Sequence, residues 1–404
     1  MVGVSSTTGP PPSASAEPPD RPDGRPAAPL PGPLAGLLVA DFSRVLAGPF
    51  ATMMLADLGA RVVKVERPGT GDDSRGYGPF LDGRSLYFAR VNRGKESVAL
   101  DLKVPADLAV ARALAVAADV VVENYRPGVM DRLGLGYADL AAANPRTVYC
   151  SISGFGHTGP WSQRPAYDAV VQAMSGIMAI TGAADGPPAK PGVPVSDLSA
   201  GLYAFGGITA ALLGRAGTGR GTHLDIAMYD ATTSLLEGAA LSWLATGVYP
   251  QRIGNAHFSI APFYTFACQD REITLCAAND ALFGALVVAL GLPGLAGDPR
   301  FATNALRHAD RVGLKQALEA ALRTAPAQHW LDALELAGVP SGPIGTVAEA
   351  MGSEQTAVRR MVVQAGGLPG LGNPLKLSGY PDPVERPAAP RLDAHGPAVR
   401  AEFR

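Results

Sequence analysis

Apolar residues fall into short, Val-rich runs that alternate with amphipathic segments from residue 34 onward. Such near-continuous runs are typical of strands buried on both faces, and they occupy residues 36–43, 61–67, 97–103, 119–125 and 146–156. Helical patterns separate several of them, and Pro49 is well placed in the first turn of the helix predicted at 50–60. The alternation predicts an α/β fold with a parallel, doubly wound sheet.

The pattern changes in the middle of the chain. A long apolar helix is predicted at 199–216, and residues 263–280 predict a hairpin that turns at Gln269–Arg271. Helical segments follow, without the strand–helix–strand rhythm, so we expect a second, smaller α+β domain here. The Pro/Gly-rich stretch near the C-terminus is expected to return to the first domain.

Composition narrows the possible functions. The 404 residues are 47% hydrophobic, which is ample for two cores. The formal net charge is −2 and Lys/Arg residues form no dense cluster, which argues against nucleic acid as a partner. The three cysteines form no C-x-x-C pair and the six histidines have no ligand spacing. We therefore expect no metal and a reducing, cytoplasmic setting.

The first 32 residues are rich in Pro, Ser and Ala and lack the apolar segment of a signal peptide. They predict a disordered tail. No run approaches the roughly 20 apolar residues that a membrane span needs, so no membrane is expected as a partner.

Parallel sheets bind ligands at the carboxyl ends of their strands. The first strand–helix turn, "DFSRVLAGPF", lacks G-x-G-x-x-G, and the chain has no P-loop. NAD and ATP are therefore poor candidates. Glu66 and Arg67 end the second strand, where an acid suits a ribose hydroxyl and an Arg a ribose phosphate. Further cations near strand ends suit either a phosphorylated adenosine or a solvated rim: Lys95, Lys103, Arg126 and Arg132.

Four blocks resemble the class III coenzyme A transferases, the relatives of formyl-CoA transferase and carnitine CoA-transferase. They are "VADFSRVLAGPFATMMLADLGARVVKVERPGTGDDSR", "YFARVNRGKESVALDLK", "VVVENYRPGVMDRLGLGY" and "SDLSAGLYAFGGITAALL". The similarity covers about residues 34–395. It implies an enzyme that moves coenzyme A, supplied as an acyl-CoA, between carboxylic acids.

The resemblance also implies an architecture. Each chain has a Rossmann-like large domain built from both of its ends, and two such chains interlock as a homodimer. The expected divisions are a tail at 1–32, the large CoA-binding domain at 33–228, a linker helix at 229–253, the small domain at 254–338, a second linker at 339–358, and the return to the large domain at 359–404.

Asp197, in "SDLSAG", matches the family's nucleophilic aspartate. Its carboxylate is expected to attack the acyl-CoA thioester and then to carry CoA as an aspartyl thioester. A helix N-terminus favours an ionised acid and offers N–H groups to oxyanions. From position alone Asp197 suits a helix cap, worth about 1 kcal/mol. The family blocks favour catalysis.

Residue-by-residue matching implies a set of cofactor contacts. Val45 and Ala47 match the turn beside the thioester, and Arg67 an arginine near the adenosine. The remaining matches are Leu100, Lys103, Asn124, Tyr125 and Arg132. A helix-surface arginine is the alternative for Arg132, and sheet packing for Tyr125.

Two departures from the family pattern bear on function. Tyr167 stands where the related 2-methylacyl-CoA racemases have a histidine base, and a tyrosine with a pKa of about 10 is a poor base. Its position assigns it to the substrate site. His257 and Phe258 interrupt the glycine run that forms a mobile flap in formyl-CoA transferase. His257 suits either a substrate contact or a loop without a role.

Several segments are most similar to the branch that handles dicarboxylates such as glutarate and hydroxymethylglutarate. A free distal carboxylate needs a cation, and Arg binds carboxylates in a fork. Arg44 is the first candidate, followed by Arg75 and Arg164. For these two, a position in a surface loop without a substrate contact is an equally good interpretation.

The sequence leaves three functions to compare: a CoA-transferase for short dicarboxylic acids, a 2-methylacyl-CoA racemase, or an acyl-CoA binder without turnover. Tyr167 argues against the second and Asp197 against the third.

Overall fold

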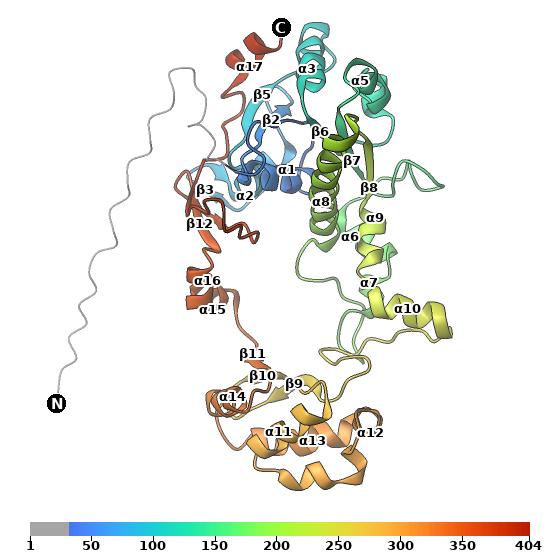
Figure 1. Ribbon diagram of the computed structural model, residues 1–404, viewed down its shortest axis with the longest axis vertical. Coiled ribbons are helices and arrows are strands. Elements are labelled where there is room, and N and C mark those ends of the chain that lie inside the picture. The colour runs from blue at the N-terminus through green and yellow to red at the C-terminus, as the bar shows by residue number, and fades with distance from the viewer. Residues whose placement is uncertain (1–31) are drawn as a thin grey trace, which may run out of the picture. The chain divides into compact units, whose positions relative to one another are not determined.

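The structure, a computed structural model, describes residues 32–404 and divides them into two compact units (Figure 1). The first unit contains residues 32–165, 197–228 and 360–404, and the second contains 166–196 and 229–359. The predicted disordered tail, apart from Gly32, lies outside the described residues.

The first unit is built on a six-stranded parallel sheet. Its strands are β1 (Leu38–Asp41), β2 (Arg61–Glu66), β5 (Glu96–Ala99), β6 (Val120–Glu123), β7 (Val148–Ser153) and β8 (His223–Ala227). Their spatial order is β5-β2-β1-β6-β7-β8, which is 3-2-1-4-5-6 when the six strands are numbered along the chain. This is the order of the Rossmann fold, and it confirms the predicted parallel α/β sheet.

The apolar runs agree with the burial of the strands, because every residue of β6, β7 and the edge strand β5 is buried. The helices of this unit are α1 (Ala47–Asp57), α2 (Leu86–Asn92), α3 (Pro105–Ala117), α4 (Val129–Arg132), α5 (Tyr137–Ala143), α8 (Val195–Thr218) and α17 (Gly396–Glu402). Short elements complete it: the 3₁₀ turn η1 (Asp73–Gly76), the hairpin β3 (Phe80–Leu81) with β4 (Arg84–Ser85), and the small sheet of β12 (Val362–Ala365), β13 (Leu368–Leu371) and β14 (Glu385–Arg386).

The C-terminal segment packs on the edge of the large sheet. Val399 and Phe403 of α17 join the core formed by the strands and α3. The Ser97 amide donates to Nδ1 of His395 at 3.0 Å, and Arg61 bridges Glu96 and Glu402. Both ends of the described chain therefore contribute to one unit.

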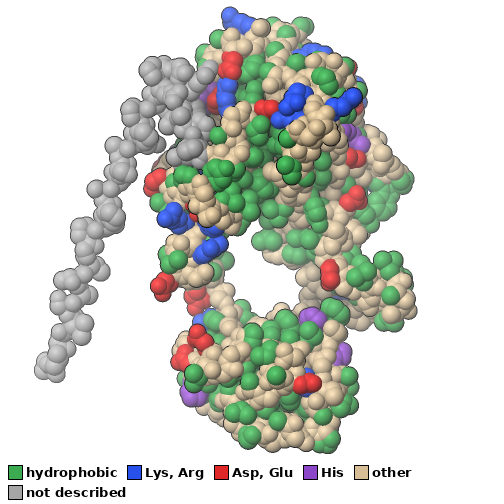
Figure 2. All heavy atoms as spheres, in the orientation of Figure 1, with side chains coloured by type: hydrophobic (Ala, Val, Ile, Leu, Met, Phe, Trp, Pro, Cys, Tyr) green, Lys and Arg blue, Asp and Glu red, His purple; other side chains and the backbone are tan. Residues whose placement is uncertain are grey.

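The long helix α8 begins at Val195, four residues before the predicted start, directly after Pro194. It buries a stripe of small and branched residues, Ala200, Ala204 and Ile208. The opposite side exposes Leu202, Tyr203 and Leu213, and Figure 2 shows apolar side chains gathered over this helix. By length and hydropathy α8 passes the test for a membrane span, a test that core helices also pass; one third of its apolar window is buried.

The second unit has a three-stranded sheet of β9 (Phe263–Ala267), β10 (Glu272–Cys276) and β11 (Ser341–Pro343). The pairing of β9 with β10 is antiparallel, which confirms the predicted hairpin. Its helices are α6 (Asp168–Met174), α7 (Ile177–Ile180), α9 (Met228–Ser234), α10 (Glu237–Thr246), α11 (Asp280–Ala289), α12 (Asn304–Ala309), α13 (Arg311–Leu322), α14 (Ala327–Leu336), α15 (Val347–Gly352) and α16 (Glu354–Val358), with 3₁₀ turns at Pro293–Gly297 and Pro299–Phe301.

A separate hydrophobic core joins this hairpin to α11, α13 and α14. Arg307 of α12 is fully buried in the same unit. Its guanidinium donates to the carbonyls of Ala261 and Phe301 and pairs with Asp280 at 2.6 Å.

Candidate active site

The sheet reverses its winding between β1 and β6, where Rossmann-like sheets bind ligands. The loops after these two strands are joined at this point. The Arg44 amide donates to Oδ1 of Asn124 at 2.8 Å, and Nδ2 of Asn124 donates to the Arg44 carbonyl at 2.8 Å. The two sequence-predicted residues thus lie together at the crevice.

The turn between β1 and α1 is held in an unusual backbone conformation. Val45 has φ = 67°, in the left-handed region that branched residues avoid. Its amide donates to both carboxylate oxygens of Asp72, at 3.1 and 3.2 Å. This carboxylate therefore fixes the turn that presents Val45 and Ala47.

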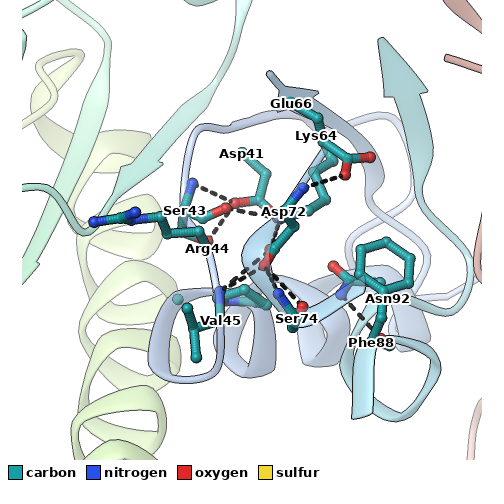
Figure 3. A network of polar contacts seen from close by, with 12 residues as sticks. Asp41, Ser43, Arg44, Val45, Lys64, Glu66, Asp72, Ser74, Phe88 and Asn92 are labelled. Atoms are coloured by element: carbon teal, nitrogen blue, oxygen red, sulfur yellow. Dashed lines mark hydrogen bonds and ion pairs between the residues drawn. The ribbon is translucent and has the colours of Figure 1, made fainter. Parts of the chain in front are cut away.

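Two buried ion pairs lie next to the turn, and Figure 3 shows Lys64 and Asp72 of the first pair and Asp41 of the second. Lys64 pairs with Asp72 at 2.9 Å and donates to the Ser43 carbonyl at 2.7 Å. Lys95 pairs with Asp41 at 3.0 Å. Burial raises the pKa of Asp72, but the Lys64 ammonium and the hydrogen bonds from Ser74 together outweigh burial and lower that pKa to about 2. Burial lowers the pKa of Lys95 to about 8 in spite of Asp41. Because Lys95 is buried, it is not part of a cationic rim.

A cluster of charged and aromatic side chains lies at the mouth of the crevice. Arg44 and Arg67 both pair with Asp73, each at 2.9 Å. The Arg44 guanidinium lies 5.8 Å from the centre of the Tyr125 ring, and Figure 3 shows its side chain pointing away from the buried pairs. Three of the predicted residues therefore gather here, at the ends of β1, β2 and β6.

The other predicted cofactor residues lie along the same edge of the sheet. Leu100 follows β5 and is buried, and its amide donates to the Glu66 carbonyl at 2.8 Å. Lys103 and Arg132 are exposed, the former before α3 and the latter at the end of α4. An exposed cation at each of these sites suits a phosphate contact.

Asp197 lies in the first turn of α8 and is half-buried. It is not the N-cap, because the helix begins two residues earlier. One turn further on, Gly201 sits against the first turn of α1: a Cβ on this glycine would lie 2.8 Å from the Ala47 carbonyl oxygen and 2.9 Å from the Phe50 ring. Close helix packing thus brings the start of α8 to the predicted thioester turn.

The profile of CoA-transferase family III matches residues 34–396. The chain belongs to CoA-transferase family III. It is 53% identical over 373 residues to the acetyl-CoA:oxalate CoA-transferase of Acetobacter aceti, covering 92% of this chain and 96% of that protein. It is 40% identical to the succinyl-CoA:glutarate CoA-transferase of Mus musculus, covering 91% of this chain and 80% of that protein.

A crystal structure of a CaiB/BaiF family protein from Brucella suis has the same fold, with a TM-score of 0.82 and 42% identity, covering 93% of this chain and all of that one. The chain is therefore an enzyme that transfers coenzyme A, as the resemblance implied. Among the described residues, no group of three or more His, Cys, Asp or Glu side chains is placed to hold a metal ion.

Not every predicted substrate contact of this CoA-transferase is available. Arg75 donates to both oxygens of Glu66 at 2.7 Å and to the Pro390 carbonyl, and its guanidinium lies 3.7 Å from the Phe88 ring centre. Because these internal contacts use its donors, Arg75 ties the C-terminal segment to β2. Arg164 lies 5.1 Å from the ring centre of its neighbour Trp161.

Two predicted residues belong to the second unit. Tyr167 directly precedes α6 and is 73% exposed. Its neighbour Asp168 accepts a hydrogen bond from the Ser196 amide at 2.9 Å, which connects α6 to the residue before Asp197.

His257 is stacked between Phe258 and Phe263, with ring centres 4.6 and 5.1 Å away. Its Nδ1 accepts from the amides of Ser259 and Ile260, both at 3.1 Å. These contacts give His257 a part in ordering its loop, and its predicted substrate contact stays a prediction.

A stacked pair on α2 was not predicted from the sequence. Tyr87 and Arg90 lie on α2, with the Arg90 guanidinium 3.9 Å from the Tyr87 ring centre. Burial raises the pKa of Tyr87, and the negative charge of Asp197 adds to this rise while Arg90 opposes it. The segment "LYFARVN" has an ordinary helical pattern, so no local signal marks these residues.

A buried acid lies behind the crevice. Glu123 ends β6, and its carboxylate accepts from the Tyr125 amide at 2.8 Å. Burial raises the pKa of Glu123 to about 7, although hydrogen bonds from Ser151 and the Tyr125 amide oppose the rise. Ser151 in turn contacts Nε2 of His223 at 3.0 Å.

Proposed function

We propose that this CoA-transferase moves CoA onto short dicarboxylic acids through a thioester on Asp197. The observation that carries the proposal is the position of Asp197 in the first turn of α8, a helix that packs through Gly201 against the first turn of α1. Relatives named for oxalate and for glutarate support a short dicarboxylic acid as acceptor. The relative named for oxalate is 53% identical to this chain, so oxalate is the first acid to test.

The proposed reaction proceeds through two mixed anhydrides. The Asp197 carboxylate attacks the thioester carbon of the acyl-CoA, and CoA leaves as a thiolate, which gives an acyl–aspartyl anhydride. The thiolate attacks the aspartyl carbonyl, so the donor acid leaves and CoA is bound to Asp197. The acceptor carboxylate then attacks this thioester and releases the thiolate. Finally the thiolate attacks the acceptor carbonyl, which yields the new CoA ester and restores Asp197.

The chain's own groups suit these steps. The first turn of α8 places Asp197 near N–H groups and the positive end of a helix dipole, which stabilise both the carboxylate and developing oxyanions. The Val45 amide is committed to Asp72, so its part is to hold the turn and not to stabilise an oxyanion.

We propose that CoA lies along the carboxyl edge of the sheet. Val45 and Ala47 would flank the thioester, and Leu100, Asn124 and Tyr125 the body of the cofactor. Arg67, Lys103 and Arg132 would meet its phosphates. Because Arg44 shares Asp73 with Arg67, we assign Arg44 to the cofactor side instead of the distal carboxylate.

Two further expectations belong to this proposal. We propose that the enzyme is an interlocked homodimer, as the family resemblance implies. We also place it in the cytoplasm, a setting that suits its three free cysteines, Cys150, Cys268 and Cys276.

The test measures CoA esters by mass spectrometry after incubation with acetyl-CoA or succinyl-CoA and a set of acids. Oxalate and glutarate represent dicarboxylates, and propionate represents monocarboxylates. We expect new dicarboxylate esters and, by intact mass, a protein adduct of one CoA. Asp197→Ala and Asp197→Asn should abolish the protein adduct and lower the rate of ester formation by at least about 10³-fold.

Transfer at the wild-type rate without Asp197 would refute the proposed nucleophile. If a 2-methylacyl-CoA takes up deuterium at its α-carbon in D₂O and no CoA is transferred, the enzyme is a racemase and not a transferase. Bound CoA with neither reaction would indicate a binding protein.

A further inference from the structure

Five charged side chains form a network at the last residue of α1, and their charges do not balance. The ion pairs run in one line through the network: Arg93 with Asp57 at 2.6 Å, Asp57 with Arg386 at 3.9 Å, Arg386 with Asp382 at 2.5 Å, and Asp382 with Lys376 at 2.6 Å. Each of these side chains is less than 20% exposed. Three cations and two carboxylates leave a net charge of +1 (3 − 2). A charge that is largely buried without a counterion is unfavourable, so this network suits one more negative charge.

Arg386 is the member of the network with an unused donor. Its Nη2 donates to Asp382, but its Nε is buried and has no hydrogen-bond partner among residues 32–404. Arg93 differs, because its Nε and Nη2 donate to Asp57 and its Nη1 to the Leu371 carbonyl. Buried donors are normally paired with an acceptor. The network thus lacks both a negative charge and an acceptor, and Arg386 indicates where the acceptor belongs.

A hollow in the surface of the first unit lies beside Arg386. It contains about 420 Å³ of space, part of it open to solvent. Four polar side chains line it, those of Asp57, Asn373, Asp382 and Arg386. The rest of the lining is mostly apolar and includes Pro33, Leu58, Leu375, Leu377, Tyr380, Pro381 and Pro383. A hollow with one cationic donor and an apolar lining suits a ligand with an anionic head and a short aliphatic chain.

The same combination does not occur at a comparable arginine elsewhere. Among residues 32–404, Arg252 is the other arginine whose buried Nε has no hydrogen-bond partner. It belongs to the second unit, where its Nη1 donates to the Ala179 carbonyl at 3.2 Å. Arg252 does not line the hollow and is not part of the charge network. The excess charge, the unused donor and the hollow coincide at Arg386.

The charge of the network also limits the kind of anion. An excess of one positive charge is balanced by a monoanion, and the carboxylates of Asp57 and Asp382 repel a second negative charge. The apolar lining favours an aliphatic chain over a fully hydrated inorganic ion. Both features point to a monocarboxylate.

The hollow is separate from the crevice. Helix α1 has 11 residues, with Ala47 at its start beside the proposed thioester turn and Asp57 at its end in the network. At 1.5 Å per residue these two residues are about 15 Å apart along the helix. An acid in the hollow is therefore a different molecule from the acid that reacts in the crevice.

We propose that this hollow binds a short aliphatic monocarboxylate. The carboxylate accepts a hydrogen bond from Nε of Arg386 and supplies the negative charge that the network lacks, while the chain lies against the apolar lining. The site goes beyond the proposed function and does not depend on Asp197. A bound acid would join the end of α1 to residues 373–386.

The experiment measures amide hydrogen exchange of the full chain by mass spectrometry with acetate, propionate or butyrate, at an ionic strength held constant with NaCl. At ten times its dissociation constant, each acid should slow exchange about tenfold in peptides that cover residues 373–386. Affinity should rise about two- to fourfold for each added methylene. Butanol, which has the chain without the charge, and inorganic phosphate should not slow exchange there.

Four variants test the contacts. Arg386→Met should raise the dissociation constant of butyrate by about 10- to 100-fold, and Arg386→Lys should restore part of this loss. Arg252→Met is the matched control and should bind butyrate as the wild type does. Leu377 is 42% exposed, so Leu377→Asn should leave the fold intact. It should weaken butyrate by about threefold and acetate by less.

Several results would overturn the site. They are equal protection by butanol or phosphate, unchanged butyrate affinity in Arg386→Met, and protection at the start of α8 instead of residues 373–386, which would place the acid in the crevice. None of these results affects the proposed function. If Arg386→Met loses its fold, as fast exchange throughout the first unit would show, Leu377→Asn decides. A selective loss of butyrate affinity then supports the site, and unchanged butyrate affinity overturns it.

Discussion

At the scale of single residues, the crevice depends on charges that are buried and paired. Lys64 with Asp72 and Lys95 with Asp41 lie next to a turn whose Val45 has a left-handed backbone. Buried pairs add little net stability, but removing one partner costs about 3–5 kcal/mol because the other charge is left alone. Their value here is geometric, since Asp72 accepts the Val45 amide and so fixes the thioester turn.

Among residues 32–404, no cation pairs with the buried acid Glu123, and this acid makes stability depend on pH. Its folded-state pKa is raised from 4.5 to about 7, chiefly by burial. The folded protein thus holds a proton that the unfolded chain releases above pH 4.5. This contribution to stability is complete below pH 4.5 and is lost as pH rises toward about 7. The maximal slope is roughly 1.4 kcal/mol per pH unit.

The predicted change is Glu123→Gln, which keeps the shape and cannot ionise. Relative to the wild type, its free energy of unfolding should rise by a few kcal/mol between pH 4.5 and pH 8, following the slope of about 1.4 kcal/mol per unit. Denaturant titrations of both proteins at several pH values measure the difference. A difference that is independent of pH would contradict the assigned pKa.

At the scale of elements, the approach of α8 to α1 brings Asp197, the proposed nucleophile, toward the turn proposed to flank the thioester. Gly201 permits this approach, because any Cβ there would come within 3.0 Å of the Ala47 carbonyl oxygen and the Phe50 ring. Backbone atoms cannot rotate away as a flexible side chain does, so the helix itself must move. A displacement of about 1 Å can lower a rate by about 10²-fold.

We therefore expect Gly201→Ala to reduce kcat by about 10- to 100-fold and to lower the melting temperature. The control is Gly284→Ala in the interior of α11, a helix of the second unit, where an added Cβ meets nothing within 4 Å. This control should keep full activity and gain about 0.5–1 kcal/mol, since alanine favours a helix. Equal effects of the two substitutions on kcat would show that the helix contact does not position Asp197.

The sequence predicted elements whose signal is local and missed those fixed by tertiary contacts. The Val-rich runs predicted the strands because strands buried on both faces are mostly apolar; buried polar residues such as Lys64 are kept there by ion pairs that the sequence does not reveal. The predicted start of α8 at residue 199 lies four residues after the observed start, because Ser196 and Asp197 are common in loops as well as in the first turn of a helix. Arg75 was indistinguishable from Arg90 in the sequence: only the fold pairs one with Glu66 and leaves the other over Tyr87.

At the scale of the whole molecule, α8 leaves an apolar surface that the first unit does not cover. Leu202, Tyr203 and Leu213 are 52%, 49% and 78% exposed on the helix that carries Asp197 in its first turn. Exposed large apolar residues grouped on one element are typical of an interface between proteins. The proposed homodimer would cover such a surface with a second copy of the chain.

An interlocked dimer makes a kinetic prediction that a simple dimer does not. Threaded chains cannot separate without unfolding, so exchange of subunits should follow the slow rate of global unfolding. Light scattering should give twice the chain mass of 41.5 kDa. When two differently tagged forms are mixed under native conditions for a day, affinity capture should recover no mixed dimer. Unfolding in guanidinium followed by joint refolding should produce it at about half of all dimers, as random pairing requires. Mixed dimers within minutes of native mixing would refute the threading, and a mass of one chain would refute the dimer itself.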